Sequence, residues 1–236
     1  ATLVAWAGST TVLYDRPVTF GASGELTTVE TGVNQTVNIG SNAMSELGGN
    51  DDVMWGRWTG GGTGGTGSYS GRDLSGDRGM HWAVGTATAD VPANGTAHYD
   101  LTASTAPVFN DGRSAPGTLT GGLVVAWNGA SSRIGAELDV AMPGDATYHM
   151  ATTGGLATPA TSELVYAGGA GAWRFSGNVP VTMTGSGAAC DGPCTASVNA
   201  QAFGAGASTI GLGFEIGASN AASSITGMGI FSPTLP

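Results

Sequence analysis

The sequence predicts an all-β protein: a soluble antiparallel up-and-down β-barrel of about eight to ten strands with an N-terminal β extension. Three observations predict this class. Apolar residues recur at every second position in short segments, and turn-forming residues separate these segments. The chain of 236 residues contains 42 glycines and 10 prolines, and hydrophobic residues make up 41%, enough for a sizeable core. Segments with helical periodicity are almost absent from the sequence.

The N-terminal part contains short strand-like segments but too few residues to bury a core of its own. These segments are 2–6, 11–14 and 17–20. One short helix is expected over 41–47, where a polar residue can cap the start and two glycines can end it. We therefore place a boundary near residue 50. Residues 1–50 form an N-terminal β segment or arm that packs on the barrel or on another subunit, and residues 51–236 form the β-barrel domain.

The barrel strands are expected where the alternation is clearest. These segments are 79–85, 95–102, 119–127, 133–142, 173–181, 210–216 and 225–231. Asn128-Gly129 lies between two of them and is the strongest hairpin signal in the chain. The glycine-rich tract 60–71 is interpreted as a long hairpin loop. It would join paired strands at Met54–Trp58 and Met80–Trp82.

Two cysteines, Cys190 and Cys194, enclose Asp-Gly-Pro, which is strong turn chemistry. Such a turn can bring the two Cα atoms within disulfide range. A zinc site is disfavoured because no further Cys or His lies at zinc-site spacing. The sequence therefore predicts a disulfide that stiffens a hairpin, and with it an oxidising compartment. The chain opens as a mature protein does after loss of a signal peptide, so we expect an extracellular or outer-surface location, with the periplasm as the alternative.

The charge balance excludes one large class of partners. Seven basic residues, all of them arginine, stand against 17 acidic residues and give a net charge of −10. A surface that tracks nucleic-acid phosphates is not expected from this balance. No segment approaches about 18 consecutive apolar residues, so no transmembrane helix is expected. Scattered aromatic residues favour a barrel with an apolar interior over a membrane barrel.

Histidines are the first candidates for chemistry. His81, His98 and His149 fall on the polar faces of their expected strands. If the strands of His81 and His98 pair, the two rings could bind a transition metal or haem. The simpler expectation is that all three histidines are exposed on the barrel exterior, and we expect no cofactor.

Carboxylates are the second candidates. Glu137 and Asp139 project from one face of a strand about 7 Å apart, a separation that glycosidases use. The alternative is a pair of solvated carboxylates on the outer face of the strand.

The sequences 50–52 and 110–112 could supply calcium ligands but also match ordinary turns. The sequence 67–71 carries the letters of a serine nucleophile motif without the helix that must follow it. We therefore expect no enzymatic activity.

Aromatic residues cluster at Trp55, Trp58, Tyr69 and Trp82. Packed together they would plug one end of the barrel. Exposed together they could stack on sugars or anchor a partner. The candidate interface residues are Leu3, Trp6, Val12, Tyr14, Trp55 and Trp58.

Several short phrases occur in a characteristic order. They are Gly95–Tyr99, Gly122–Val125, Phe175–Gly177, Ala200–Ala207, Gly211–Ile216 and Ile225–Phe231. In that order they resemble the eight-stranded barrel of transferrin-binding-protein-B-like lipoproteins and related proteobacterial surface proteins. The same pattern, after a motif like Trp55–Trp58, also follows FecR-type domains. The resemblance covers roughly residues 53–233 and implies a cell-surface or extracellular barrel without catalysis. In that family, loops and a separate lobe bind partners, and we expect no counterpart of that lobe in this chain.

Two functions follow from these observations. The first is a non-enzymatic extracellular or cell-surface interaction protein that binds a protein partner or ligand through its loops, with an iron-uptake-type role implied by the resemblance. The second is a self-assembling structural subunit of a fibre or surface layer. In that homo-oligomer or fibre, the strand at 2–6 would be added to the sheet of a neighbouring subunit.

Overall fold

The computed structural model is all-β, as the sequence predicts. It describes residues 2–6, 9–13, 16–67, 70–159, 163–168, 173–218 and 223–234, with side chains from residue 16 onward. Within these residues the helical structure is a single 3-10 turn, η1 (Ala205–Ala207). No helix of the described part is long and apolar enough to cross a bilayer.

The strands are ordered along the chain as follows: β1 (Thr2–Trp6), β2 (Ser9–Leu13), β3 (Val18–Phe20), β4 (Leu26–Gly32), β5 (Gln35–Asn38), β6 (Ala43–Gly49), β7 (Val53–Thr59), β8 (Gly64–Thr66), β9 (Met80–Gly85), β10 (Gly95–Phe109), β11 (Thr118–Trp127), β12 (Arg133–Ala141), β13 (Thr147–Ala151), β14 (Val165–Tyr166), β15 (Arg174–Thr184), β16 (Cys194–Phe203), β17 (Thr209–Gly217) and β18 (Ile225–Pro233).

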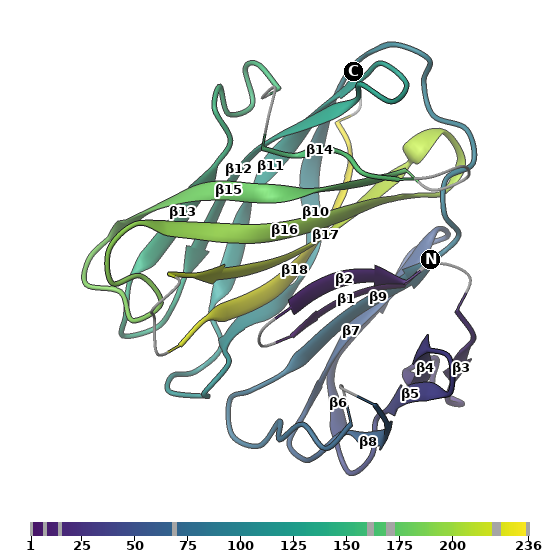
Figure 1. Cartoon of the computed structure of the whole chain (residues 1–236), viewed down its shortest axis with the longest axis vertical. Coiled ribbons are helices and arrows are strands. Elements are labelled where there is room, and N and C mark those ends of the chain that lie inside the picture. Colours follow the sequence, from purple (N-terminus) through teal and green to yellow (C-terminus); the bar gives the residue numbers. More distant parts are fainter. Residues whose placement is uncertain are drawn as a thin grey trace.

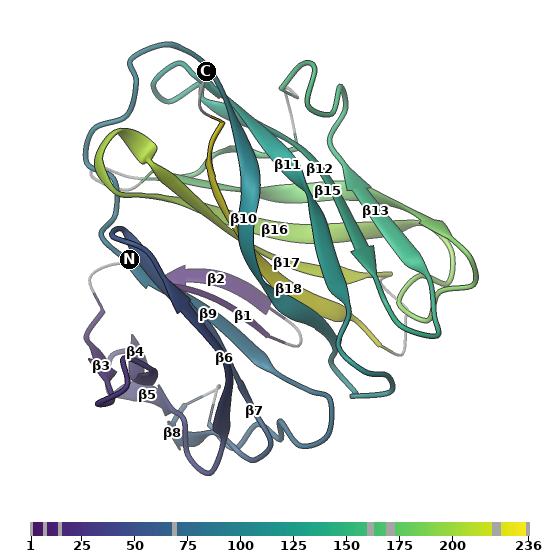
Figure 2. The same cartoon turned by 180° about the vertical axis from the view of Figure 1, so that it is seen from behind.

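The C-terminal strands close into an antiparallel barrel (Figures 1 and 2). Its sheet runs in the order β11-β10-β18-β17-β16-β15-β13-β12, and pairing of β11 with β12 closes it. The short strand β14 is an addition that pairs with β12 and β15. The hairpin expected at Asn128-Gly129 is confirmed, because β11 and β12 pair up to Ala126 and Arg133 on either side of it.

The barrel interior is filled with apolar side chains. On β12, Ile134, Leu138 and Val140 are buried in one large core cluster, while Glu137 and Asp139 between them are exposed. Strands β17 and β18 are instead buried on both faces, because the five-stranded sheet covers their outer side. One large apolar cluster fills the barrel, so the predicted apolar interior is confirmed. An eight-stranded barrel is narrow enough for side chains to fill its interior, and here the side chains of the large core cluster occupy it.

Two further sheets lie on one side of the barrel and make a layered structure (Figures 1 and 2). The five-stranded sheet, β2-β1-β9-β7-β6, packs on the barrel, and the four-stranded sheet, β3-β4-β5-β8, packs on its other face. Strand β9 shows this arrangement: Ala83 packs toward the barrel, whereas Met80 and Trp82 pack toward the four-stranded sheet. The contact with the barrel joins Val53, Ala83, Phe203, Met228 and Ile230.

The boundary between sheets falls between β9 and β10, not near residue 50. Strands β7 and β9, expected in the barrel, pair with each other as predicted but join the five-stranded sheet. Strand β1 pairs with β9 on one edge and with β2 on the other. Both edges of β1 are therefore used within the chain, which contradicts its expected donation to a neighbouring subunit.

Two local expectations were wrong. The helix expected over 41–47 is replaced by the edge strand β6, because pairing with β7, with one register shift between Met44 and Glu46, fixes an extended backbone there. Tertiary pairing readily overrides a weak helix propensity. The glycine tract 60–71 is not one loop, since it contains β8, which pairs with β5.

The predicted disulfide between Cys190 and Cys194 is confirmed, with a Cα–Cα distance of 5.4 Å. Both cysteines are buried at one end of the barrel core. The segment before them is held by Tyr148, whose hydroxyl accepts a hydrogen bond from the Ala189 amide at 3.2 Å. Asp145 accepts a second hydrogen bond from the Ala188 amide at 3.1 Å.

Replacing both cysteines by serine is expected to lower the free energy of unfolding by about 2 kcal/mol, because the bridge closes a short loop. Urea unfolding of the double variant against the parent checks this. Alanine at both positions is the control, since it avoids burying two hydroxyl groups. A loss above about 4 kcal/mol in the alanine variant would contradict a merely local role for the bridge.

Candidate functional site

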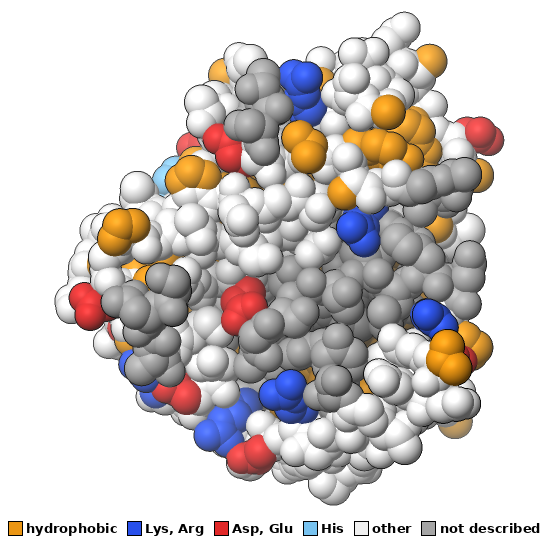
Figure 3. Space-filling view, in the orientation of Figure 1, with side chains coloured by type: hydrophobic (Ala, Val, Ile, Leu, Met, Phe, Trp, Pro, Cys, Tyr) orange, Lys and Arg blue, Asp and Glu red, His pale blue; other side chains and the backbone are white. Residues whose placement is uncertain are grey.

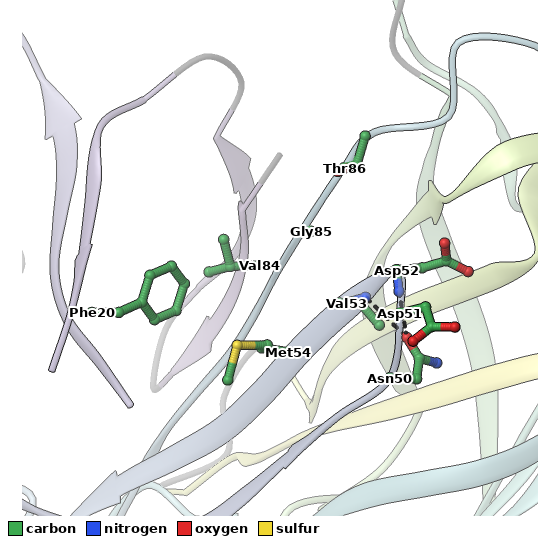
Figure 4. Close-up of a pocket in the computed structure, with 9 residues that line it drawn as sticks. All are labelled: Phe20, Asn50, Asp51, Asp52, Val53, Met54, Val84, Gly85 and Thr86. Atoms are coloured by element: carbon green, nitrogen blue, oxygen red, sulfur yellow. Dashed lines mark hydrogen bonds between the residues drawn. The ribbon is translucent and has the colours of Figure 1, made fainter. Parts of the chain in front are cut away.

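A cleft of about 360 Å³ opens where the two smaller sheets meet beside the barrel (Figure 4). Three parts of the chain form it: the end of β3, the turn between β6 and β7, and the paired ends of β7 and β9. Its lining residues are Phe20, Asn50, Asp51, Asp52, Val53, Met54, Val84, Gly85 and Thr86.

One wall of the cleft is apolar. Met54 and Val84 are direct partners across β7 and β9 and pack against the core between the two smaller sheets. Phe20 faces them from β3 (Figure 4), and its side chain is 38% exposed. A large apolar group left partly in water is unfavourable by itself, so this wall offers surface that a ligand could cover.

The opposite wall is a polar turn that is fixed in place. The Asn50 Oδ1 atom accepts hydrogen bonds from the amides of Asp52 and Val53, each at 2.9 Å. The Asp52 carboxylate accepts hydrogen bonds from Ser208 at 2.5 Å and Thr209 at 3.3 Å, which connect the turn to the barrel. The cleft therefore combines an apolar wall with a polar wall whose backbone is already ordered.

The two acidic turns use their side-chain oxygens within the chain. At 50–52, Asn50 and Asp52 make the hydrogen bonds just described. At 110–112, Asn110 Oδ1 accepts from Ser223 Oγ at 2.8 Å, and Asp111 pairs with Arg113 at 2.5 Å. Among the described residues no group of three His, Cys, Asp or Glu side chains is placed to hold a metal ion.

The histidines do not share one environment. His98 is exposed on β10, as expected; β10 pairs with β11 and β18 and not with β9, so the pairing that a shared His81–His98 site requires is not present. His149 is half-buried on the barrel exterior, where Nδ1 lies 2.8 Å from the Asp139 carboxylate. Asp139 and Glu137 are both exposed there, in the position that the solvated alternative expects.

His81 is fully buried, not exposed, because β9 is covered on both faces. Its Nδ1 lies 2.8 Å from the Thr105 hydroxyl on barrel strand β10. Burial, together with the charge of Arg57, lowers the pKa of His81 from 6.5 to about 3. The ring is therefore neutral and links the five-stranded sheet to the barrel.

Arg57 and Glu46 extend this polar contact. The Arg57 guanidinium donates to Glu46 Oε1 at 2.8 Å, and Glu46 Oε2 accepts from the Ala106 amide of the barrel at 3.0 Å. Ala106 lies where the register between β10 and β18 shifts, so its amide is not used by that ladder. Sequence reasoning missed this network, although an arginine inside the apolar run of β7 was a signal for it.

Trp55, Trp58 and Trp82 pack outside the barrel and do not plug it. Trp58 is 1% exposed, and its Nε1 donates to the Leu26 carbonyl at 2.9 Å between the two smaller sheets, with Trp82 in the same cluster. Trp58 is thus a core residue and not an interface residue. Trp55 is half-buried against the sheet–barrel contact. The side chains of Leu3, Trp6 and Val12, and all of Tyr14 and Tyr69, lie outside the described residues.

The surface around these features is poor in charge. On the described part of the face shown in Figure 3, the charged side chains are scattered, and groups of hydrophobic side chains lie among other side chains and backbone. This agrees with a sequence in which only 10% of the residues are charged. Binding on such a surface depends on shape and apolar contact more than on charge.

No protein-family model matches the chain, and no curated protein matches it either. Among solved structures, a point mutant of the vaccine antigen transferrin-binding protein B from Haemophilus parasuis Hp5 is similar, with a TM-score of 0.48 and 8% identity over 100% of this chain and 45% of that chain. A double mutant of that antigen gives a TM-score of 0.45 and 9% identity over the same shares. Isotype 1 transferrin-binding protein B from serogroup B Neisseria meningitidis gives 0.42 and 11%, over 82% of this chain and 36% of that chain. The chain thus spans less than half the length of these similar structures.

Proposed function

We propose that this protein is a non-enzymatic binding protein of the cell surface or extracellular space, and that the cleft holds its ligand or partner. The observation that carries the proposal is the half-exposed ring of Phe20, which faces Met54 and Val84 across a cleft of about 360 Å³. Ligand sites commonly combine an apolar wall with a few fixed polar groups. The side chains of the cleft have this composition.

Two further features support this proposal. The filled barrel interior leaves the outside of the molecule for binding. The turn at 50–52 is already fixed by its hydrogen bonds, so little conformational entropy of the turn is lost when a ligand binds there. The disulfide supports a location in an oxidising compartment. An iron-uptake-type role is a narrower form of the proposal and rests on the sequence resemblance.

A methyl-labelled sample tests the cleft with N-acetyl amides of phenylalanine, tryptophan, leucine and arginine as probes. We expect at least one apolar probe to shift the Met54 and Val84 methyl signals saturably. Phe20→Ser is expected to weaken that binding at least tenfold, because the exposed ring is removed. Val33→Ser is the matched control, since Val33 is 80% exposed but does not line the cleft.

Two results would overturn the proposal. The first is that none of the probes gives a saturable shift at Met54 or Val84. The second is equal weakening by Phe20→Ser and Val33→Ser, which would mean that probes bind exposed apolar residues without selecting the cleft.

A further inference from the structure

Two buried polar atoms in the contact between the five-stranded sheet and the barrel have no hydrogen-bond partner among the described residues. They are Arg57 Nε and His81 Nε2. Arg57 is 6% exposed and His81 is 0% exposed. The two residues are direct partners across β7 and β9, so their side chains leave the same face of the sheet side by side.

The remaining hydrogen bonds of His81 determine what its Nε2 atom can do. The Thr105 hydroxyl lies 3.5 Å from the Met228 carbonyl and 2.8 Å from His81 Nδ1. The Thr105 hydroxyl has one proton, and the Met228 carbonyl and His81 Nδ1 both lie within its reach. When that proton goes to the Met228 carbonyl, Thr105 accepts from His81 and Nδ1 carries the hydrogen. In that tautomer, which the proposal below adopts and its test examines, the neutral ring leaves Nε2 as an acceptor with a free lone pair.

Arg57 presents the complementary group. Its Nη2 atom is used by Glu46, whereas Nε–H is a buried donor. A donor and an acceptor on neighbouring side chains, both shielded from solvent, need a small molecule that can accept from one and donate to the other. Water does both, and buried waters occur about once per 27 residues at such polar sites.

We propose that one ordered water molecule binds between Arg57 and His81, accepting from Arg57 Nε–H and donating to His81 Nε2. The site joins the arginine–glutamate pair to the histidine, so a single polar chain runs from Glu46 to Thr105 through the contact between sheet and barrel. A metal cation is disfavoured by the neighbouring guanidinium, and an anion is disfavoured because it needs donors on both sides.

Nitrogen-15 NMR of the full chain at neutral pH tests the proposal without any variant. The expected result is a neutral His81 ring with the proton on Nδ1, together with a water-selective Overhauser signal from a long-lived water to the His81 ring or to Arg57 Hε. A proton on Nε2 would overturn the proposal, because two donors would then face each other and an anion would fit better. Absence of a long-lived water at both groups would overturn it as well.

A variant adds a second readout. Arg57→Lys keeps the positive charge but removes Nε–H, and we expect the water signal at His81 to disappear. Arg78→Lys is the control, since Arg78 pairs with Asp73 on the surface, and it should leave the signal unchanged. An unchanged signal in Arg57→Lys would overturn the assignment of Arg57 as the donor.

Discussion

Acidification from pH 7 to pH 4 is expected to lower the free energy of unfolding of this protein by about 3 kcal/mol through His81 alone. In the unfolded chain this histidine binds a proton below its ordinary pKa of 6.5, whereas in the folded protein burial keeps it neutral down to a pKa of about 3. Between these values the unfolded state holds the extra proton. Stability is therefore complete above pH 6.5 and falls as the pH drops, by about 1.4 kcal/mol per pH unit.

Urea unfolding at several pH values between 7 and 4 measures this slope. His81→Gln is expected to reduce the slope of the free energy of unfolding against pH by about 1.4 kcal/mol per pH unit, the contribution of one proton, because glutamine does not titrate. His98→Gln is the matched control, since His98 is exposed, and it should leave the slope as it is. The same slope in His81→Gln and the parent would contradict the prediction. If His81→Gln does not fold, direct NMR titration of His81 decides, and a pKa near 6.5 would contradict it.

Trp58→Ala is expected to cost about 3–5 kcal/mol of stability, the largest loss we expect from a single side chain. The ring is 1% exposed in the cluster that joins the two smaller sheets, beside Leu26 and Trp82. Its removal leaves a cavity and also leaves the Leu26 carbonyl without the indole donor. Both losses act on the same contact between sheets.

Denaturant unfolding followed by circular dichroism measures the effect. Trp58→Phe keeps most of the ring and loses the hydrogen bond, so its cost is expected to be about 1–2 kcal/mol. Trp55→Ala is a second comparison, because Trp55 is only half-buried. Equal losses for Trp55→Ala and Trp58→Ala would show that Trp58 does not hold the two sheets together.

The strands of the barrel were predictable because large apolar residues on one face of each strand point into the core and smaller or polar residues lie on the other. On β12 the alternation of Ile134, Leu138 and Val140 with Glu137 and Asp139 records this geometry directly. The hairpin at 128–129 and the disulfide were predictable for a similar reason, since local turn chemistry is sufficient to specify them.

The layering was not predictable from the same rule. Period-two alternation shows that a strand has two different faces, but it does not show what covers the second face. His81 occupies the less apolar face of β9 and is nevertheless fully buried, because the barrel lies against it. The boundary near residue 50 was wrong for the related reason that β1 finds its partner, β9, about 80 residues further along the chain.

The cleft was missed because exposure is a property of the assembled layers. Phe20 is a lone aromatic residue in a short strand, and nothing beside it in the sequence marks it as accessible. Trp55 and Trp58 show the opposite difficulty. They stand three positions apart in one strand and therefore point to opposite faces. The sequence does not show that the barrel covers the face of Trp55 and the four-stranded sheet covers that of Trp58.

The pairing of β1 with β9 has a consequence for biosynthesis. Strands β1 and β2 leave the ribosome long before β9, and β2 also contacts β16, which is made later still. The edge of β1 that pairs with β9 therefore stays unpaired until β9 has been synthesised. Contacts so distant in sequence also slow folding. An unpaired strand edge invites pairing with other chains during that interval. A nascent chain halted before β9 would thus be prone to aggregate, and a chaperone that shields the first hairpin would suppress this.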